Sequence, residues 1–235
     1  MANQALQSRL VQVAAGRVKL EGNLYIPTGA QGVVLFAHGS GSSRHSPRNR
    51  FVAEALQQAG LATLLIDLLT RDEEAEDIQT ARLRFDIGFL AGRLVHATHW
   101  LQQDPHTSGL AVGYFGASTG AGAALVAAAE LPDVVRAVVS RGGRPDLAGP
   151  ALPRVQAPTL LIVGGDDVPV IGLNQKAQRQ LVMADHQLVI VPGATHLFKE
   201  PGALEEVARL AADWFARYLT TAGHHRTGTG GRVER

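Results

Sequence analysis

Serine, aspartate and histidine follow one another along this chain in an order suited to nucleophilic catalysis. Ser118 lies at the centre of Gly116–Gly120, a pentapeptide of the pattern G-x-S-x-G, and Asp166, Asp167 and His196 come later. A serine hydroxyl becomes a nucleophile when a histidine takes its proton, and a carboxylate orients that histidine. The residue types therefore predict acyl transfer, with Ser118 as nucleophile, His196 as base and either aspartate as acid.

The segments before these candidate catalytic residues are predicted strands, and the residues follow the strand ends. Residues 110–115 are apolar and residues 121–130 are rich in alanine, which indicates a buried strand, a tight turn and a helix. This arrangement forms a nucleophile elbow, whose glycines leave room for neighbouring elements. The aspartates and His196 likewise follow the apolar segments 159–163 and 187–191. Because parallel strands end at one sheet edge, these side chains are expected to meet there.

A turn upstream of the pentapeptide could complete an oxyanion hole. The apolar segment 33–37 leads into His38–Ser43, which reads HGSGSS. The backbone N–H groups of Ser40 and of Thr119, the residue after the nucleophile, are the predicted donors to a developing oxyanion.

Other residues near this machinery have weaker assignments. Gly39, Gly41 and Arg141 are candidates for contact with substrate. Arg141 and Arg144 would either bind a carboxylate or lie on a solvated loop, the alternative that surface arginines favour. The ring of His38 is expected to brace neighbouring loops through hydrogen bonds.

Taken together, the chain resembles the α/β-hydrolase superfamily and, within it, the small proteins related to dienelactone hydrolase. The landmarks that carry the resemblance are His38–Gly41, Asp67–Thr70, Gly116–Gly120, Gly164–Asp167 and Gly193–His196. The resemblance implies a triad in the order serine, aspartate, histidine. It also implies the pattern Gly-Gly-x-Asp-x-x-Val, which fits Gly164, Gly165, Asp167 and Val170 and favours Asp167 over Asp166 as the acid.

The nucleophile departs from the dienelactone hydrolases, which use cysteine. This chain has no cysteine, so Ser118 favours hydrolysis of small carboxylic esters without metal or organic cofactor. The same triad would also serve a dienelactone or C–C bond hydrolase, a peptidase or a perhydrolase, because fold and triad do not fix the pocket. A binding protein that kept the fold without catalysis is the alternative outside the enzymes.

The order of elements predicts an α/β fold, with a mostly parallel sheet and helices on both faces. Segments 9–13 and 17–26 alternate apolar and polar residues, which indicates antiparallel strands at one edge. Further strands are expected at 61–66 and 134–139, and helices at 50–59, 81–103, 176–183 and 201–219.

The charged segment Arg71–Asp77 is expected to be a mobile loop or short helix at the site rim. The stretch from Val139 to Thr159, about twenty residues, is too short for a large cap domain, so an open site is expected.

Composition limits the partners. The 235 residues include 22 basic and 21 acidic side chains, for a net charge of +1, which gives no long-range attraction to nucleic acid or to an anionic membrane. No apolar run reaches the length of a membrane span, and the first twenty residues lack the apolar core of a signal peptide. We therefore expect a cytoplasmic enzyme, a monomer or homodimer, with one domain over residues 1–222. Residues 223–235 are expected to form a disordered tail, whose His224–His225 pair is not expected to bind metal.

Overall fold

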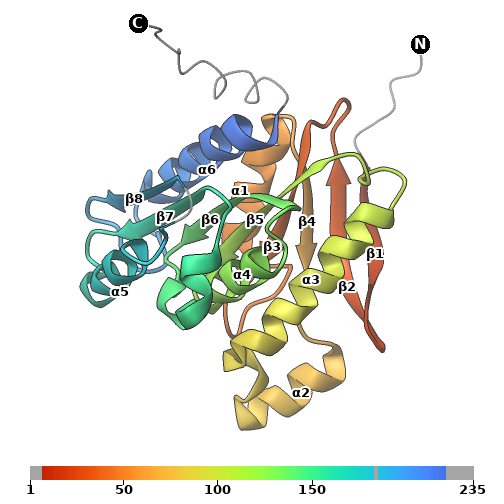
Figure 1. Cartoon of the computed structure of the whole chain (residues 1–235), viewed down its shortest axis with the longest axis horizontal. Helices are drawn as coiled ribbons and strands as arrows, with labels where there is room; N and C mark the ends of the chain where they lie inside the picture. The colour runs from red at the N-terminus through yellow and green to blue at the C-terminus, as the bar shows by residue number, and fades with distance from the viewer. Residues whose placement is uncertain (1–6, 183–184, 221–235) are drawn as a thin grey trace, which may run out of the picture.

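A single eight-stranded sheet organises the chain in the computed structural model, which describes residues 7–182 and 185–220 (Figure 1). The strands are β1 (Gln7–Ala15), β2 (Val18–Ile26), β3 (Gly32–Ala37), β4 (Ala62–Ile66), β5 (Ala111–Ala117), β6 (Val135–Arg141), β7 (Thr159–Gly164) and β8 (His186–Val191). Their order across the sheet is β1-β2-β4-β3-β5-β6-β7-β8. Strands β1 and β2, and β2 and β4, pair antiparallel, whereas all later pairs are parallel. The expected fold class is confirmed.

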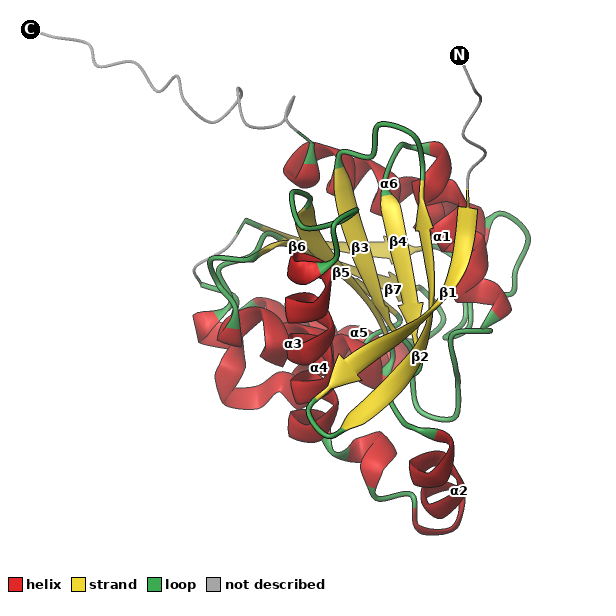
Figure 2. Cartoon of the chain, turned by 90° about the vertical axis from the view of Figure 1, so that its right-hand side faces the viewer, coloured by secondary structure: helices red, strands yellow, loops and turns green. Residues whose placement is uncertain are grey.

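Helices cover both faces of this sheet. They are α1 (Pro47–Gln58), α2 (Arg71–Thr80), α3 (Ile87–Gln103), α4 (Thr119–Glu130), α5 (Val168–Gln178) and α6 (Ala203–Leu219), with the 3₁₀ helices η1 (Leu83–Phe85) and η2 (Pro145–Arg154). Helices α1 and α6 lie on one face, and α3, α4 and α5 lie on the other (Figure 2). The two faces accordingly form two apolar clusters.

The buried strands explain why the central part of the sheet is so apolar in sequence. Every residue of β3, β4 and β7 is buried, as expected for parallel strands that helices cover on both sides. Phe36 and Phe115 pack against each other across neighbouring strands, with tilted rings whose centroids lie 4.9 Å apart. This core fixes the strand ends that carry the candidate site.

The largest differences from the expected helix boundaries occur at two helices, α3 and α5. The helix expected to begin at residue 81 begins at Ile87, because the side chain of Asp86 accepts a hydrogen bond from the Phe89 N–H at 2.9 Å and caps it there. Phe85, which the apolar spacing places on the buried face of that helix, instead lies in η1 and is 57% exposed. The chain reverses at Ala81, which has a φ of 53°.

The helix expected over 176–183 is also displaced toward the N-terminus. Helix α5 runs from Val168 to Gln178, with Asp167 at its N-cap and a proline in its first turn. Proline suits the first turn, where its missing N–H has no partner to lose. The expected tail, residues 223–235, lies outside the described residues. In the part of the chain described, no helix is long and apolar enough to cross a membrane.

Candidate active site

The turn at Ser118 has the strained geometry of a nucleophile elbow. Ser118 follows β5, precedes α4 and has φ 50° and ψ −123°, a backbone conformation that residues other than glycine rarely adopt. The flanking glycines are required by close backbone contacts. A Cβ on Gly116 would lie 2.4 Å from the Cα of Ala121, and one on Gly120 would lie 2.3 Å from the carbonyl oxygen of Ala37. The glycine spacing of the motif is therefore a packing requirement.

The turn after β3 lies directly against this elbow. A Cβ on Gly39 would stand 3.0 Å from the Cβ of Ser118, so the absence of a side chain there lets the turn approach the nucleophile. Thr119 is the first residue of α4, and its N–H belongs to the helix-terminal amides that have no partner within the helix. The Ser40 N–H donates to Thr119 Oγ1 at 2.9 Å. An oxyanion at this position would therefore compete with the Thr119 hydroxyl for one of its two expected donors.

Asp167 and His196 form a close pair. The ring Nδ1 of His196 lies 2.6 Å from Oδ2 of Asp167, and the Asp167 side chain is largely buried. Asp166 is exposed, and its N–H donates to the carbonyl of Ala194. Of the two adjacent aspartates, the structure thus places Asp167 on the histidine and leaves Asp166 facing solvent. The contact leaves Nε2 of His196 directed away from the carboxylate.

A tight turn after β6 joins the serine to the histidine loop. The Ser118 N–H donates to the carbonyl of Arg141 at 3.4 Å, and the Arg144 N–H donates to that of Ser118 at 3.0 Å. Between them, Gly142 has a φ of +49°, and a Cβ there would lie 3.0 Å from the carbonyl oxygen of His196. Ser118 and His196 therefore flank the same turn. The His196 side chain is 39% exposed, so a small solute can reach it.

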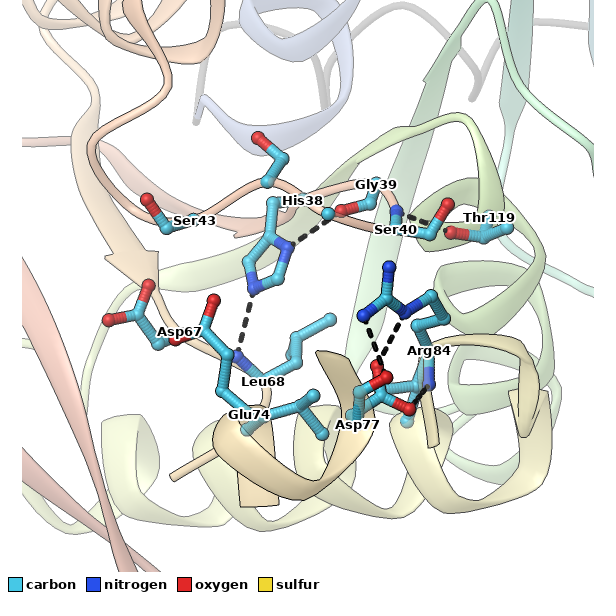
Figure 3. A pocket seen from close by; sticks show the side chains of 14 residues that line it. His38, Gly39, Ser40, Ser43, Asp67, Leu68, Glu74, Asp77, Arg84 and Thr119 are labelled. Atoms are coloured by element: carbon cyan, nitrogen blue, oxygen red, sulfur yellow. Dashed lines mark hydrogen bonds and ion pairs between the residues drawn. The ribbon is translucent and has the colours of Figure 1, made fainter. Parts of the chain in front are cut away.

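His38 braces the loops around the site, as expected. Its Nε2 accepts a hydrogen bond from the Leu68 N–H at 3.0 Å, and its Nδ1 lies 3.0 Å from the carbonyl oxygen of Gly39, to which it donates (Figure 3). Burial lowers the pKa of His38, although the Gly39 carbonyl and the carboxylate of Asp67 act in the opposite direction. A neutral ring fits this pattern, because it can accept at one nitrogen and donate at the other.

A small, partly open cavity of about 30 Å³ lies beside the oxyanion turn. Figure 3 shows the turn on one side and the side chains of α2 and η1 on the other. Gly39, Gly41, Ser40 and Thr119 are among its lining residues. The two glycines expected to contact substrate therefore border a partly open space next to the elbow, although Ser118 and His196 are not among its lining residues.

The segment expected as a loop or short helix at the rim is the ten-residue helix α2. Thr70 and Glu73 form a reciprocal capping box at its N-terminus. At its other end, the buried carboxylate of Asp77 accepts hydrogen bonds from the Arg84 side chain, at 2.6 Å, and from backbone N–H groups of η1. Burial alone would raise the pKa of Asp77, but the bonds from Arg84 outweigh it and hold that pKa below its ordinary value. This pair fixes one wall of the cavity.

Arg141 and Arg144 do not share one environment. Arg144 is partly exposed and pairs with Asp146, with two contacts of 2.8 Å. Arg141 is only 7% exposed, so the expectation of a solvated loop is wrong for this residue. It is the last residue of β6, and its side chain reaches Asn49 of α1. Burial, with a smaller effect of Arg48, lowers the pKa of Arg141 to about 10.

Several residues around the site are absent from the sequence-based candidates. Asp77 and Arg84 line the cavity, and Asn49 contacts Arg141. Only the helix start at Thr70 has a sequence signal, the capping pattern T-x-x-E. Within residues 7–182 and 185–220, no group of three histidine, cysteine, aspartate or glutamate side chains could hold a metal ion. The His224–His225 pair lies outside the described residues.

Comparison with known proteins agrees with the fold. The model of the Dienelactone hydrolase family matches residues 20–225. A crystal structure of a dienelactone hydrolase from Anabaena variabilis is 68% identical, with a TM-score of 0.89, over 91% of this chain and 99% of that one. The chain therefore belongs to the dienelactone hydrolase family, which makes it a member of a hydrolase family.

More distant and longer relatives add context. The esterase Pf2001 of Pyrococcus furiosus has the same fold, with a TM-score of 0.73 and 18% identity, over 91% of this chain and 94% of that one. Proteins from two strains of Mycobacterium tuberculosis, CDC 1551 / Oshkosh and H37Rv, are 59% identical over 94% of this chain and carry the provisional name phosphoribosyl transferase. The match covers 49% of their length, so the chain spans about half of these curated relatives.

Proposed function

We propose that this member of the dienelactone hydrolase family is a serine esterase that cleaves small carboxylic esters through Ser118, His196 and Asp167. One observation carries the proposal. The Asp167–His196 pair, at 2.6 Å, adjoins the turn that holds the strained Ser118. A carboxylate on Nδ1 fixes the tautomer that leaves Nε2 free to accept a proton.

The chemistry follows from these positions. His196 accepts the proton of Ser118 as Oγ attacks the ester carbonyl, and Asp167 stabilises the imidazolium that results. The N–H of Thr119, at the positive end of α4, and the N–H of Ser40 stabilise the oxyanion of the tetrahedral intermediate. Its collapse expels the alcohol, which takes the proton from His196. Water then attacks the acyl-enzyme by the same steps in reverse.

Access to the site favours small or exposed esters. The segment between β6 and β7, where a cap domain could be inserted, holds only η2, two short helical turns joined by a kink at Gly149, which pack against α4. Both Ser118 and His196 are partly exposed. The mycobacterial proteins that carry the transferase name match this chain over only 49% of their length. The proposal concerns the region that those proteins share with this chain.

Hydrolysis of 4-nitrophenyl esters of increasing acyl length tests this proposal. We expect turnover of the short esters, a loss of at least about 10³-fold in kcat/KM for Ser118→Ala, and little activity on long acyl chains. Ser108→Ala is the matched control, because Ser108 is exposed and precedes β5 at the sheet edge opposite Ser118. Equal activity of wild type and Ser118→Ala would contradict the proposal. Product analysis on amide, peroxyacid and C–C substrates would separate the other reactions open to this triad.

A further inference from the structure

Arg141 is a buried cation beside the proposed nucleophile. It is paired in the sheet with Ala117, and its carbonyl accepts a hydrogen bond from the Ser118 N–H at 3.4 Å. Its side chain leaves the sheet on the face covered by α1, where Nη2 donates to Oδ1 of Asn49 at 3.3 Å. The guanidinium therefore lies between the end of β6 and the first turn of α1.

Most hydrogen-bonding capacity of this guanidinium is unused. The Nε and Nη1 atoms of Arg141 are buried and have no partner, and neither has the buried Nε of Arg48. An unpaired buried donor costs free energy, and it costs more when the group is charged. Arg48 and Arg141 together thus carry three buried donor atoms that no acceptor among the described residues satisfies.

Three other poorly exposed arginines of this chain are each paired with a carboxylate. Arg44 pairs with Asp67 and Glu21, and Arg84 pairs with Asp77. Arg93 pairs with Glu73, although its Nε is also buried without a partner. No ion pair of the described residues includes Arg48 or Arg141, and the charge that acts on Arg141 most closely is the like charge of Arg48. The chain therefore places a carboxylate on each of those three arginines and omits one here.

The first turn of α1 adds to the positive potential. Ser46 caps this twelve-residue helix, no acidic side chain stands in its first turn, and Arg48 and Asn49 are its second and third residues. Pro47 has no N–H and the Asn49 N–H donates to Ser46 Oγ, so this helix end attracts an anion mainly through its dipole. The Arg141 guanidinium, the like charge of Arg48 and the first turn of α1 thus lie near one another, and among the described residues no carboxylate pairs with either arginine.

We propose that Arg48, Arg141 and the first turn of α1 bind a phosphate monoester group on the substrate, so that the enzyme cleaves esters that also carry a phosphate. A phosphate monoester carries about two negative charges at neutral pH, which matches two guanidiniums, whereas one carboxylate would leave a buried positive charge. Arginine also presents its donors in a fork that fits phosphate oxygens. This inference rests on the proposed esterase function for the reaction, but the binding itself does not depend on hydrolysis.

Binding of inorganic phosphate, followed by calorimetry on the full chain, tests the site directly. Arg48→Met and Arg141→Met are each expected to weaken phosphate binding by at least about tenfold. Arg50→Met is the matched control, because Arg50 is exposed on the same helix, and it should bind as wild type does. Arg48 lies near the helix start and is partly exposed, so its variant tests the site even if Arg141→Met does not fold. Acetate should bind much more weakly than phosphate.

Three results would overturn the inference: no phosphate binding to wild type, equal binding by Arg48→Met, or equal affinity for acetate and phosphate. A kinetic comparison then separates this site from the proposed function. The 4-nitrophenyl ester of phosphoglycolic acid should lose at least about tenfold in kcat/KM in Arg48→Met, whereas 4-nitrophenyl acetate should change by less than about threefold. Phosphate binding without hydrolysis of either ester would support the site and contradict the esterase. Hydrolysis of both with an unchanged ratio in Arg48→Met would support the esterase and overturn the site.

Discussion

Replacement of Asp167 by asparagine separates the two adjacent aspartates. The Oδ2 atom of Asp167 lies 2.6 Å from Nδ1 of His196, and an amide can present its N–H₂ group there, which favours the wrong histidine tautomer. In a buried serine triad this change lowers kcat by about 10⁴-fold, or about 5 kcal/mol in the barrier. His196 is 39% exposed, and solvent screens part of the carboxylate's effect. We therefore expect a loss of about 10² to 10³-fold in kcat for Asp167→Asn.

The neighbouring residue provides the control for this measurement. Asp166 has the same chemistry but is exposed, so Asp166→Asn should stay within about twofold of wild type. Both variants should be assayed on 4-nitrophenyl acetate, with circular dichroism to confirm folding. A greater loss in Asp166→Asn than in Asp167→Asn would refute the assignment of the acid.

Two further predictions concern stability. Gly120→Ala places a Cβ 2.3 Å from the Ala37 carbonyl oxygen and should lower the free energy of unfolding by about 3 kcal/mol. Gly92→Ala, in open space on α3, should raise that free energy by about 0.5–1 kcal/mol. Urea denaturation of both variants measures these changes, and equal effects would refute the packing argument. Burial holds the pKa of His38 below 6.5. The contribution of the neutral His38 ring to the free energy of unfolding is therefore complete above about pH 6.5, and it falls at lower pH by at most about 1.4 kcal/mol per pH unit. The stability difference between wild type and His38→Asn should therefore shrink on acidification, and a difference that grows would contradict the neutral, bracing ring.

The parts of the fold that strong periodicity and close packing determine are predictable from sequence. The buried strands read as short apolar runs because helices cover both of their faces, and the glycines around Ser118 mark backbone contacts that exclude a Cβ. Both signals are local in sequence, even though the contacts are not. The elbow and the strands that lead to Asp167 and His196 can therefore be placed from the order of residues alone.

Helix boundaries depend on caps that the apolar pattern does not reveal. Asp86 fixes the start of α3 by capping it, and Thr70 with Glu73 starts α2 within a strongly charged segment. Helix α5 begins directly after Asp167, and its second residue is a proline. These capping signals are present in the sequence. Helix starts predicted from the capping residues rather than from the apolar pattern would agree with the structure.

The environment of Arg141 cannot be read from sequence at all. A strand-end arginine before two glycines is compatible with a solvated loop, whereas in the structure its side chain is buried and donates to Asn49 in the first turn of α1. Likewise, the Asp77–Arg84 pair and the cavity that it borders arise from the return of the chain through α2 and η1. Such sites depend on tertiary placement, which residue spacing alone does not specify.

Covalent labelling tests the central claim most directly. A fluorophosphonate reacts with a serine only when the hydroxyl is activated by a base and the oxyanion is stabilised, so it reports the assembled machinery rather than the residue alone. We predict a single adduct in the intact mass of the wild-type protein, located at Ser118 by peptide mapping and absent from Ser118→Ala. An adduct of equal yield in Ser118→Ala, or none in wild type, would contradict the assignment of Ser118 as the nucleophile.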